Sequence, residues 1–365
     1  MRRTLLVLAT ALSAIVLAGC IKSPFVPGPT PARTVAVPAS IDATGVTDVS
    51  GAFAAFLASI PDGSTISLAP GGRYRMESTL RIRGRHNLTF RGNGATVFAT
   101  TPGDRVRSHI AIEGGSDIVF DNIRVKGANP NAGKVPEEAY QVDKEAQHGF
   151  DILGASRVTL TGVTVTDTYG DFVDISKHGG VWADGVHITR SHFERNGRQG
   201  IAITAARNVL IEGNRLRDMR RATFDLEPGR TDGWGADNVT IRNNDIGIGR
   251  LNFVAAAGRG PLSNITVEGN RLHGQALQFY VIDKDGGVRR NWRVLNNTSD
   301  LEFANPSQAV MQFWKVDGLE VRGNRQPMKS RFVMYGVRAV DSCNLSLNGN
   351  DYPNARAQRI IVGGC

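Results

Sequence analysis

Carboxylic acids recur at one position of several short apolar segments in the first two thirds of the chain. Asp151, Asp174 and Asp225 each stand between two apolar residues. This alternation is typical of a strand with one buried face, so the three carboxylates are expected to point outward from neighbouring strands. The segments that align in this way are 150–152, 173–175, 201–203, 224–226, 253–255, 279–281 and 311–313, with the central residues Asp, Asp, Ala, Asp, Val, Tyr and Gln.

Such a row of carboxyl groups predicts acid–base chemistry on a glycosidic bond. Strands lie about 4.8 Å apart, so Asp151 and Asp174 would repel each other, which raises one pKa or favours a cation. Glu227 follows Asp225 on the same outward side of its strand. Inverting hydrolysis needs an acid and a base about 6.5 to 9.5 Å apart, which Asp225 can form with Asp174 or with Glu227. Asp174, Asp225 and Glu227 are therefore the candidate catalytic carboxyl groups.

The same region allows a second reaction, β-elimination on a uronic acid. In that reaction a cation, or an Arg or Lys, neutralises the sugar carboxylate while a base removes the C5 proton. Asp151 and Asp174 would then hold Ca²⁺, and Lys177, Arg198 or His148 would be the base. The residues expected to bind the polysaccharide are His148, Asp171, Gln199, Trp234 and Tyr280.

The acidic row also has a simpler interpretation, because outward Asp residues on strands often contact only water or neighbouring backbone. The protein would then be a non-catalytic glycan-binding or surface structural protein. Like charges on adjacent strands are disfavoured without a functional reason, which favours an enzyme. No glycine-rich phosphate loop, Ser-His-Asp order or cysteine metal motif is present in the sequence, and we expect no nucleic-acid partner.

An internal repeat indicates how these strands are arranged. The pattern seen in Asn238-Val-Thr-Ile-Arg-Asn-Asn244 recurs, in strict or looser form, with starts at 87, 117, 157, 185, 208, 238, 264, 291, 318 and 344. Apolar and polar residues alternate within most copies, and a Gly-Asn pair suited to a tight turn often follows. One strand per copy cannot bury its apolar face alone, so the copies are predicted to stack as a solenoid.

The chain resembles the right-handed parallel β-helices of the pectin lyase-like superfamily over residues 41–365. The resemblance implies an all-β fold, a right-handed parallel β-helix of about ten coils with an N-terminal capping helix, and an (acidic) polysaccharide as substrate or ligand. The motifs of polygalacturonases, calcium pectate lyases and alginate epimerases are missing, so the choice between lyase and hydrolase stays open. The superfamily's ladder of stacked Asn side chains is matched by Asn93, Asn214, Asn244, Asn270, Asn297, Asn324 and Asn350, with interruptions at Ile123, Val163 and Ser191.

Two segments outside the repeats complete the expected fold. Phe53, Phe56 and Leu57 stand at helical spacing after Asp48, the expected N-cap. This helix resembles the caps of pectate lyase-like domains, and a solenoid needs such a cap to cover its end. The loop 128–147 accounts for the longest interval between copies of the repeat and is expected to overhang the acidic groove.

The first 19 residues resemble the signal peptide of bacterial lipoproteins. A basic pair precedes an apolar run that is shorter than a membrane-spanning helix, and small residues precede Cys20. The resemblance implies acylation of Cys20 after cleavage, so the protein is expected to be exported and lipid-anchored to the bacterial cell envelope. Residues 20–40 are proline-rich and are predicted to form an extended tether before a single β-helix domain at 41–365.

Composition agrees with an exported, repetitive protein. The chain has 365 residues, 42 of them Gly, and a formal net charge of +9. Glycine above its typical share of about 7% marks many turns, and the basic charge would attract polyanions. Besides Cys20, the sequence contains Cys343 and Cys365, which an oxidising envelope compartment permits to form a disulfide.

Overall fold

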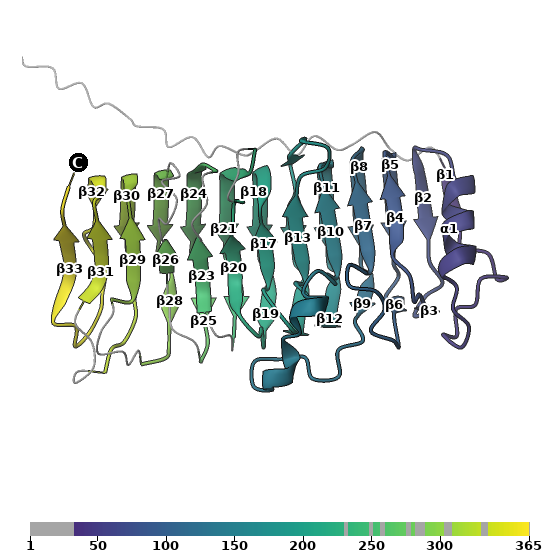
Figure 1. Ribbon diagram of the computed structural model, residues 1–365, viewed down its shortest axis with the longest axis horizontal. Coiled ribbons are helices and arrows are strands. Elements are labelled where there is room, and N and C mark those ends of the chain that lie inside the picture. The colour runs from purple at the N-terminus through teal and green to yellow at the C-terminus, as the bar shows by residue number, and fades with distance from the viewer. Residues whose placement is uncertain are drawn as a thin grey trace, which may run out of the picture.

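The computed structural model describes residues 33–229, 233–247, 251–255, 260–274, 279–281, 289–302, 309–329 and 335–364, with 251–255 and 279–281 described by their backbone only. The strands stack side by side along one long axis, from α1 (Ser50–Ser59) and β1 (Arg33–Ala36) at one end to β33 (Ala357–Val362) at the other (Figure 1). They form three parallel sheets, which we call sheets A, B and C. The predicted all-β parallel solenoid of about ten coils is therefore confirmed.

Each coil contributes strands to the three sheets in turn. In spatial order, sheet A contains β1, β2 (Ser64–Ser67), β5 (His86–Arg91), β8 (Ser116–Asp121), β11 (Ser156–Thr161), β14 (Ala183–Asp184), β18 (Ala205–Glu212), β21 (Gly235–Arg242), β24 (Leu262–Glu268), β27 (Arg289–Leu295), β30 (Val316–Arg322) and β32 (Cys343–Ser346), with β15 (His187–Thr189) beside β11 and β18. Sheet B contains β3 (Arg73–Arg75), β6 (Thr96–Phe98), β9 (Arg124–Lys126), β12 (Thr164–Thr168), β16 (His192–Asn196), β19 (Arg215–Arg217), β22 (Asp245–Ile246), β25 (Arg271–Leu272) and β28 (Thr298–Ser299). Sheet C contains β4 (Leu80–Arg83), β7 (Ile110–Glu113), β10 (Phe150–Leu153), β13 (Val173–Ser176), β17 (Ile201–Ile203), β20 (Ala222–Leu226), β23 (Leu251–Ala255), β26 (Phe279–Val281), β29 (Met311–Trp314), β31 (Tyr335–Val340) and β33.

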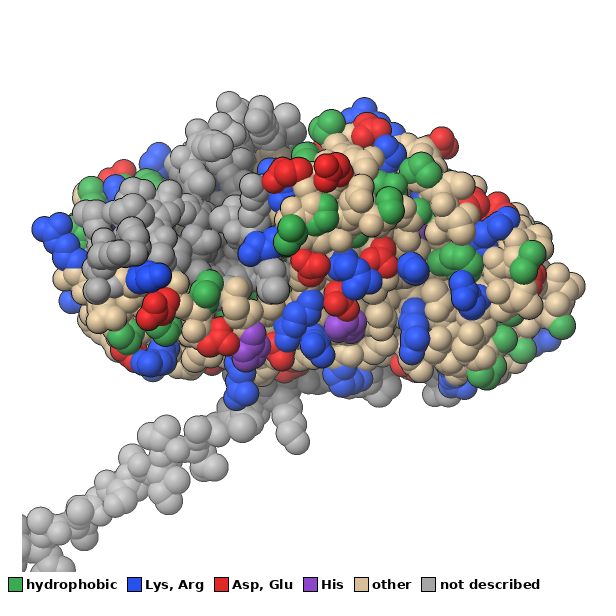
Figure 2. Space-filling model, turned by 90° about the horizontal axis from the view of Figure 1, so that it is seen from below, with side chains coloured by type: hydrophobic (Ala, Val, Ile, Leu, Met, Phe, Trp, Pro, Cys, Tyr) green, Lys and Arg blue, Asp and Glu red, His purple; other side chains and the backbone are tan. Residues whose placement is uncertain are grey.

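The interior is filled by the inward side chains of all three sheets. Phe90 and Phe120 stack with their ring centroids 4.5 Å apart, and Phe150 contacts Phe120 edge-on at 5.2 Å. Because side chains alternate along a strand, the outward residues of the same strands are free to form surface sites. On the face shown in Figure 2, hydrophobic side chains are scattered and charged side chains of both signs intermingle.

The repeat begins with Asn or Asp in most copies because the backbone is left-handed at that position. Asn238, Asn264 and Asn291 lie within strands of sheet A with φ of 52°, 58° and 55°. Asn and Asp tolerate this region better than most side chains, and Gly185 and Gly318 take the same place in two other copies with positive φ. Each repeat therefore encodes a bend within its strand as well as the turn that follows it.

The Asn ladder implied by the resemblance is present along 214–350. The Oδ1 atom of Asn270 accepts hydrogen bonds from the backbone N–H of Asn244 at 3.0 Å and from its side-chain Nδ2 at 2.9 Å. The Nδ2 atom of Asn270 then donates to Oδ1 of Asn297 at 2.8 Å. Each Asn thus accepts hydrogen bonds from the Asn of the coil before it. Its own side-chain amide donates a hydrogen bond to the Asn of the coil after it.

Two positions of the ladder differ from the prediction. Ser191 extends the ladder instead of interrupting it, because its hydroxyl accepts a hydrogen bond from the backbone N–H of Val163 at 3.1 Å. Asn93 is separate from the ladder, and its Nδ2 donates to the backbone oxygen of Leu68 at 2.8 Å. A short hydroxyl can therefore replace the amide as acceptor.

We expect Asn270→Ala to lower the free energy of unfolding by about 2 to 4 kcal/mol, because it leaves two buried donors of Asn244 without their acceptor. Urea denaturation followed by circular dichroism measures this loss. Asn348→Ala, at an exposed position, is the matched control and should change the same quantity by less than about 0.5 kcal/mol. Equal losses in the two variants would contradict a stabilising ladder.

Helix α1 lies at the N-terminal end of the solenoid, as predicted for a cap (Figure 1). It buries Phe53 and Leu57. The predicted N-cap is wrong by one residue, because Val49 occupies the cap position and no side chain caps the helix. Asp48 instead accepts hydrogen bonds from the backbone N–H of Ser50 at 3.0 Å and from its hydroxyl at 2.6 Å.

The solenoid begins earlier than predicted. Strand β1 falls inside the segment 20–40 that we predict as a tether, yet it pairs in parallel with β2 from Arg33 onward. The solenoid therefore already includes residues 33–36 and begins before residue 41. The predicted signal peptide and Cys20 lie outside the described residues. Within the described residues, no helix is long and apolar enough to cross a membrane.

Candidate functional site

The predicted row of acidic residues is confirmed by the register of sheet C. Asp151 pairs with Asp174, Asp174 pairs with Ala202, and Ala202 pairs with Asp225. At about 4.8 Å between strands, Asp151 and Asp174 are direct neighbours, and Asp225 is two strands beyond Asp174. The row continues through Val254, Tyr280 and Gln312.

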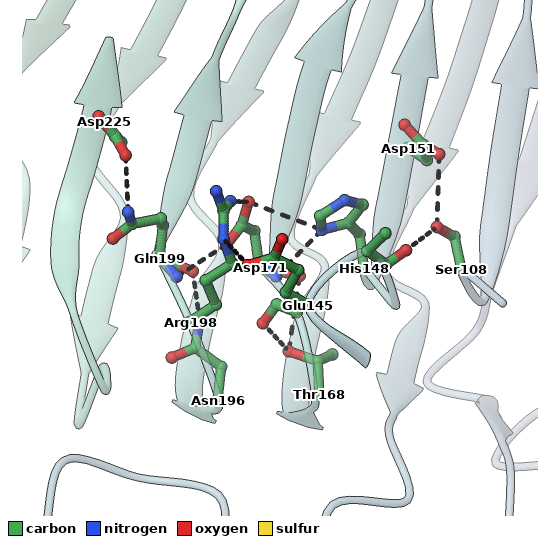
Figure 3. Close-up of polar contacts among 12 residues, drawn as sticks. Ser108, Glu145, His148, Asp151, Thr168, Asp171, Asn196, Arg198, Gln199 and Asp225 are labelled. Carbon is green, nitrogen blue, oxygen red and sulfur yellow. Dashed lines mark hydrogen bonds and ion pairs between the residues drawn. The ribbon is translucent and has the colours of Figure 1, made fainter. Parts of the chain in front are cut away.

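A buried ion pair lies just before β13 (Figure 3). Asp171 is fully buried, and its Oδ2 accepts a hydrogen bond from Nη1 of Arg198 at 2.7 Å, while its Oδ1 accepts one from the backbone N–H of Gln199 at 2.7 Å. Burial raises the pKa of Asp171 to about 6, although the charge of Arg198 opposes this rise. Arg198 also lies 3.4 Å from Oε2 of Glu227 and 3.6 Å from Oε2 of Glu145. One guanidinium therefore balances three carboxyl groups.

His148 adjoins this ion pair as a neutral ring. Its Nδ1 accepts a hydrogen bond from the backbone N–H of Asp171 at 3.0 Å (Figure 3). Burial lowers the pKa of His148 to about 4, against the opposing charge of Asp151. Because Nδ1 is an acceptor in this bond, the hydrogen of the neutral ring is on Nε2. His148 can therefore donate a hydrogen bond through Nε2 but has no free basic nitrogen.

Asp174 is the least compensated carboxyl group of the site. It is half-buried, and none of the described residues donates a hydrogen bond to its side chain. Burial, followed by the charges of Asp151 and Asp171, raises the pKa of Asp174 well above its usual range. Burial also raises the pKa of Asp151, whose Oδ2 lies 3.4 Å from the Ser108 hydroxyl that donates to it. Asp174 therefore keeps its proton at pH values where an ordinary aspartate has lost it.

Asp225 and Glu227 differ sharply in exposure although they are two residues apart. Only 2% of Asp225 is exposed, whereas 44% of the Glu227 side chain is. Nε2 of Gln199 donates to Oδ2 of Asp225 at 2.6 Å (Figure 3), and Oδ1 of Asp225 has no hydrogen-bond partner within the described residues. Burial and then the neighbouring Glu227 raise the pKa of Asp225 well above its usual range. The buried Asp225 is therefore disfavoured in its ionised form beside Glu227.

The loop 127–147 brings a further carboxylate to these residues. It contains the short 3₁₀ helices η1 (Glu137–Ala139) and η2 (Val142–Lys144) and projects from the solenoid in Figure 1. Glu145 lies 3.6 Å from Arg198 and accepts a hydrogen bond from the Tyr140 hydroxyl at 2.7 Å. The predicted position of the loop over the acidic residues is confirmed by this contact. Neither Glu145 nor Tyr140 is among the predicted site residues, because no periodic pattern places residues of a long loop.

Arg220 holds this loop against later coils. It is nearly fully buried, and it donates to Oε2 of Glu137 at 2.6 Å and to the backbone oxygen of Lys134 at 3.2 Å. The guanidinium of Arg221 lies 4.9 Å from the ring centroid of Tyr140. These contacts tie the loop to the coil that precedes β20, so its closed position is part of the folded structure.

We expect Arg220→Gln to release this loop, because the glutamine is too short to keep both contacts of the arginine. Trypsin should then cleave after Lys134 and Lys144 about tenfold faster than in the unchanged protein, as measured by mass spectrometry of the fragments. Arg215→Gln, at an exposed position of sheet B, should leave the rate unchanged. A rate for Arg220→Gln that matches this control would contradict the assigned role.

Two predicted residues contact each other and not the carboxylates. The ammonium group of Lys177 lies 4.2 Å from the ring centroid of Trp234. None of the described residues forms an ion pair with Lys177, and its contact with the indole covers one face of Trp234. The structure therefore brings together Asp151, Asp171, Asp174, His148, Arg198, Gln199, Asp225 and Glu227, and it places Lys177 and Trp234 in a separate contact.

The side chain of Tyr280 and the whole of Cys365, both predicted, lie outside the described residues. The backbone of Tyr280 lies in β26 in register with Gln312, but its side chain is outside the described residues. Cys343 on β32 is disulfide-bonded. Cys365, its predicted partner, is also outside the described residues, so the pairing of these two cysteines stays a prediction.

Three side chains of the site offer ligand atoms close enough together to hold a cation. Ligand atoms of His148, Asp171 and Asp174 lie within 4.8 Å of one another. However, both oxygens of Asp171 already accept hydrogen bonds, and the charge of Arg198 is 2.7 Å from one of them. A cation would have to displace Arg198 and compete for the His148 nitrogen. The donor set therefore does not fit a cation in this arrangement, and the predicted Ca²⁺ between Asp151 and Asp174 stays untested.

The fold and the site together define a class of protein. A family model described as the right-handed β-helix region matches residues 108–298, which is just over half of the chain. The chain therefore belongs to the right-handed β-helix family. Among curated proteins, none matches the sequence.

Solved structures with the same fold have diverse functions. The surface protein and adhesin PfbA of Streptococcus pneumoniae matches with a TM-score of 0.60 and 14% identity over 91% of this chain and 100% of that one. The A-module of mannuronan C-5 epimerase AlgE4 of Azotobacter vinelandii matches with a TM-score of 0.56 and 16% identity over 91% and 99%. The endo-xylogalacturonan hydrolase of Aspergillus tubingensis matches with a TM-score of 0.57 and 12% identity over 89% and 95%. At these identities the similarity establishes the fold alone. The activity has to be inferred from the site.

Proposed function

We propose that this protein is a glycoside hydrolase that acts on a polysaccharide. The observation that carries the proposal is the combination of a half-buried Asp174 of raised pKa with a half-exposed Glu227 that is bound to Arg198. Asp225 is two strand spacings, about 9.6 Å, from Asp174, and Glu227 lies two residues beyond Asp225, so there is room for a water between the Asp174 and Glu227 carboxyl groups. The polysaccharide-active proteins among the fold neighbours support the substrate class.

The proposed reaction assigns a separate role to each carboxyl group. Asp174 donates its proton to the glycosidic oxygen as the bond from that oxygen to the anomeric carbon breaks. Glu227 takes a proton from a water molecule, whose oxygen attacks the anomeric carbon from the opposite side. Arg198 orients the Glu227 carboxylate through its contact with Oε2. The products are two shorter sugars, and the configuration at the anomeric carbon is inverted.

The alternative of β-elimination has less support because its three candidate bases are engaged. Arg198 contacts three carboxyl groups, which raise its pKa further, so it stays protonated. His148 already uses Nδ1 as an acceptor. Lys177 lies over the ring of Trp234. None of these three groups is an available base next to Asp174.

The charge of the site indicates a neutral sugar at the cleaved bond. The carboxyl groups of Asp151, Asp171, Asp174, Asp225, Glu227 and Glu145 are balanced there by one contacting guanidinium, that of Arg198. A uronic acid bound beside them would add a further negative charge to a poorly solvated region. We therefore expect uncharged glycosyl units at the point of cleavage.

A screen of neutral and uronic polysaccharides tests the proposed activity. New reducing ends without an ultraviolet-absorbing unsaturated product are expected on a neutral glycan. An unsaturated product would show elimination and overturn the proposal. Glycan binding without any turnover would also overturn it and would favour the non-catalytic glycan-binding protein that is the alternative.

We also propose that the protein is exported and anchored through a lipid on Cys20, from the sequence of the first 20 residues. Fractionation of expressing bacteria should place the protein in the membrane pellet. Cys20→Ser should move it to the soluble fraction, since one lipid-bearing residue provides the anchor. An unchanged membrane fraction in Cys20→Ser would contradict the lipid anchor.

A further inference from the structure

A hollow with unpaired basic side chains lies on sheet B, whereas the acidic row lies on sheet C. It has a volume of about 600 Å³ and spans β3, β6 and β9. Its lining includes Arg73, Arg124 and Lys126, together with Phe98, Thr96 and Asn93. The register of sheet B sets Arg73, Thr96 and Arg124 in one outward row, and Phe98 and Lys126 in the next. Strand β3 therefore contributes Arg73 and β9 contributes Arg124 and Lys126, while β6 between them contributes Thr96 and Phe98.

These three cations are not neutralised by the protein. All three residues are exposed, and no carboxylate of the described chain lies within 4.0 Å of their charged groups. The nearest outward cation, Arg75, lies 3.7 Å from Glu77, whose carboxylate accepts hydrogen bonds from Thr100 and Thr101. On sheet A, by contrast, exposed arginines such as Arg157 are paired with a carboxylate of the adjacent coil.

The form of the hollow restricts what can bind there. The guanidinium of Arg73 lies 5.1 Å from the ring centroid of Phe98, which holds it at the wall of the hollow. Arg73 and Arg124 are two strand spacings apart, about 9.6 Å, so they can contact different anionic groups of one ligand. A concave surface can accept a narrow polysaccharide chain. The flat surface of a membrane cannot reach the side chains at the bottom of the hollow.

We propose that this hollow binds an anionic polysaccharide through its carboxylate or sulfate groups. The site is separate from the proposed hydrolase site, whose own charge is negative, and it does not depend on that activity. Its role is to hold the protein on an acidic glycan. Attraction between exposed charges falls with ionic strength, so binding should weaken as salt is added.

Two dextrans of equal length, one sulfated and one uncharged, provide the probe. The full chain should bind dextran sulfate and not dextran in isothermal titration calorimetry. A variant that combines Arg73→Gln, Arg124→Gln and Lys126→Gln should bind dextran sulfate at least about tenfold more weakly, a loss of about 1.4 kcal/mol. The control combines Arg83→Gln, Arg157→Gln and Arg293→Gln, which removes the same charge from ion-paired positions. Its affinity should change less than about twofold.

Equal weakening in the two triple variants would overturn the proposal, because net charge alone would then explain binding. Tighter binding to phosphatidylglycerol vesicles than to dextran sulfate would also overturn it in favour of a membrane surface. Asp174→Asn should bind dextran sulfate as the unchanged protein does, so failure of the hydrolase proposal leaves this result intact. Thermal unfolding of both triple variants confirms that they are folded when the affinities are compared.

Discussion

Asp174→Asn is expected to reduce turnover by about 10²- to 10⁴-fold, because the amide cannot donate a proton to the glycosidic oxygen. The same substitution is expected to raise the melting temperature near neutral pH. The folded protein carries Asp174 in a half-buried position beside Asp151 and Asp171, which disfavours its ionised form. An Asn at this position carries no charge and avoids that cost. A residue kept only for stability would not show loss of activity together with gain of stability.

The raised pKa of Asp174 determines how the gain in stability of Asp174→Asn depends on pH. The folded-state pKa of Asp174 lies above its value in the unfolded chain, so the folded protein binds more protons between those two values. Stability is therefore lost as pH rises through this window, and Asp174→Asn removes that loss. Melting temperatures of the two proteins should converge below pH 4 and diverge above it. Thr164→Ala, on the outward side of sheet B, is a control that should show no such divergence.

Arg198→Met is expected to lower the free energy of unfolding by about 3 to 5 kcal/mol. Asp171 is fully buried and loses the cation that lies 2.7 Å from its Oδ2. Removal of one partner of a buried ion pair leaves the other charge uncompensated. Methionine keeps most of the length and apolar contact of the arginine, so the change mainly reports the lost charge. Urea denaturation at pH 8, where Asp171 with a pKa of about 6 is largely ionised, measures the effect.

A second substitution separates the charge from the packing. Asp171→Asn in the Arg198→Met background removes the uncompensated carboxylate and should recover a large part of the lost stability. Activity should not recover, because Glu227 still lacks the guanidinium that contacts it. Stability that stays low in the double variant would show that Arg198 acts through packing and not through its charge.

The acidic row could be predicted from the sequence because the side chains of a strand alternate strictly. Asp151, Asp174 and Asp225 each stand between inward apolar residues, so their shared outward face follows from local pattern. Their register across β10, β13 and β20 follows because each coil brings the same segment back to sheet C. The repeat thus determines the neighbours of each residue even though the intervals between copies vary.

The turns and the long loop were harder to predict. Asp171, Arg198 and Gln199 precede their strands, where no periodicity fixes the direction of a side chain, so their mutual contacts required the folded backbone. Glu145 comes from a loop whose position depends on Arg220, a residue that is distant in the sequence. The exclusion of Lys177 from the cluster likewise depends on a tertiary contact, that with Trp234. The contacts and the burial of these residues therefore required the folded structure.

The stereochemistry of the first product tests the central claim most directly. Once a cleaved polysaccharide is found, proton NMR of the reaction mixture in its first minutes reports the anomeric configuration before mutarotation. Glu227 follows β20, which is two strands from the β13 position of Asp174, and this separation predicts inversion, through direct attack of water. A product that retains the configuration of the substrate would contradict this account, because it requires two carboxyl groups close enough for a covalent glycosyl-enzyme intermediate.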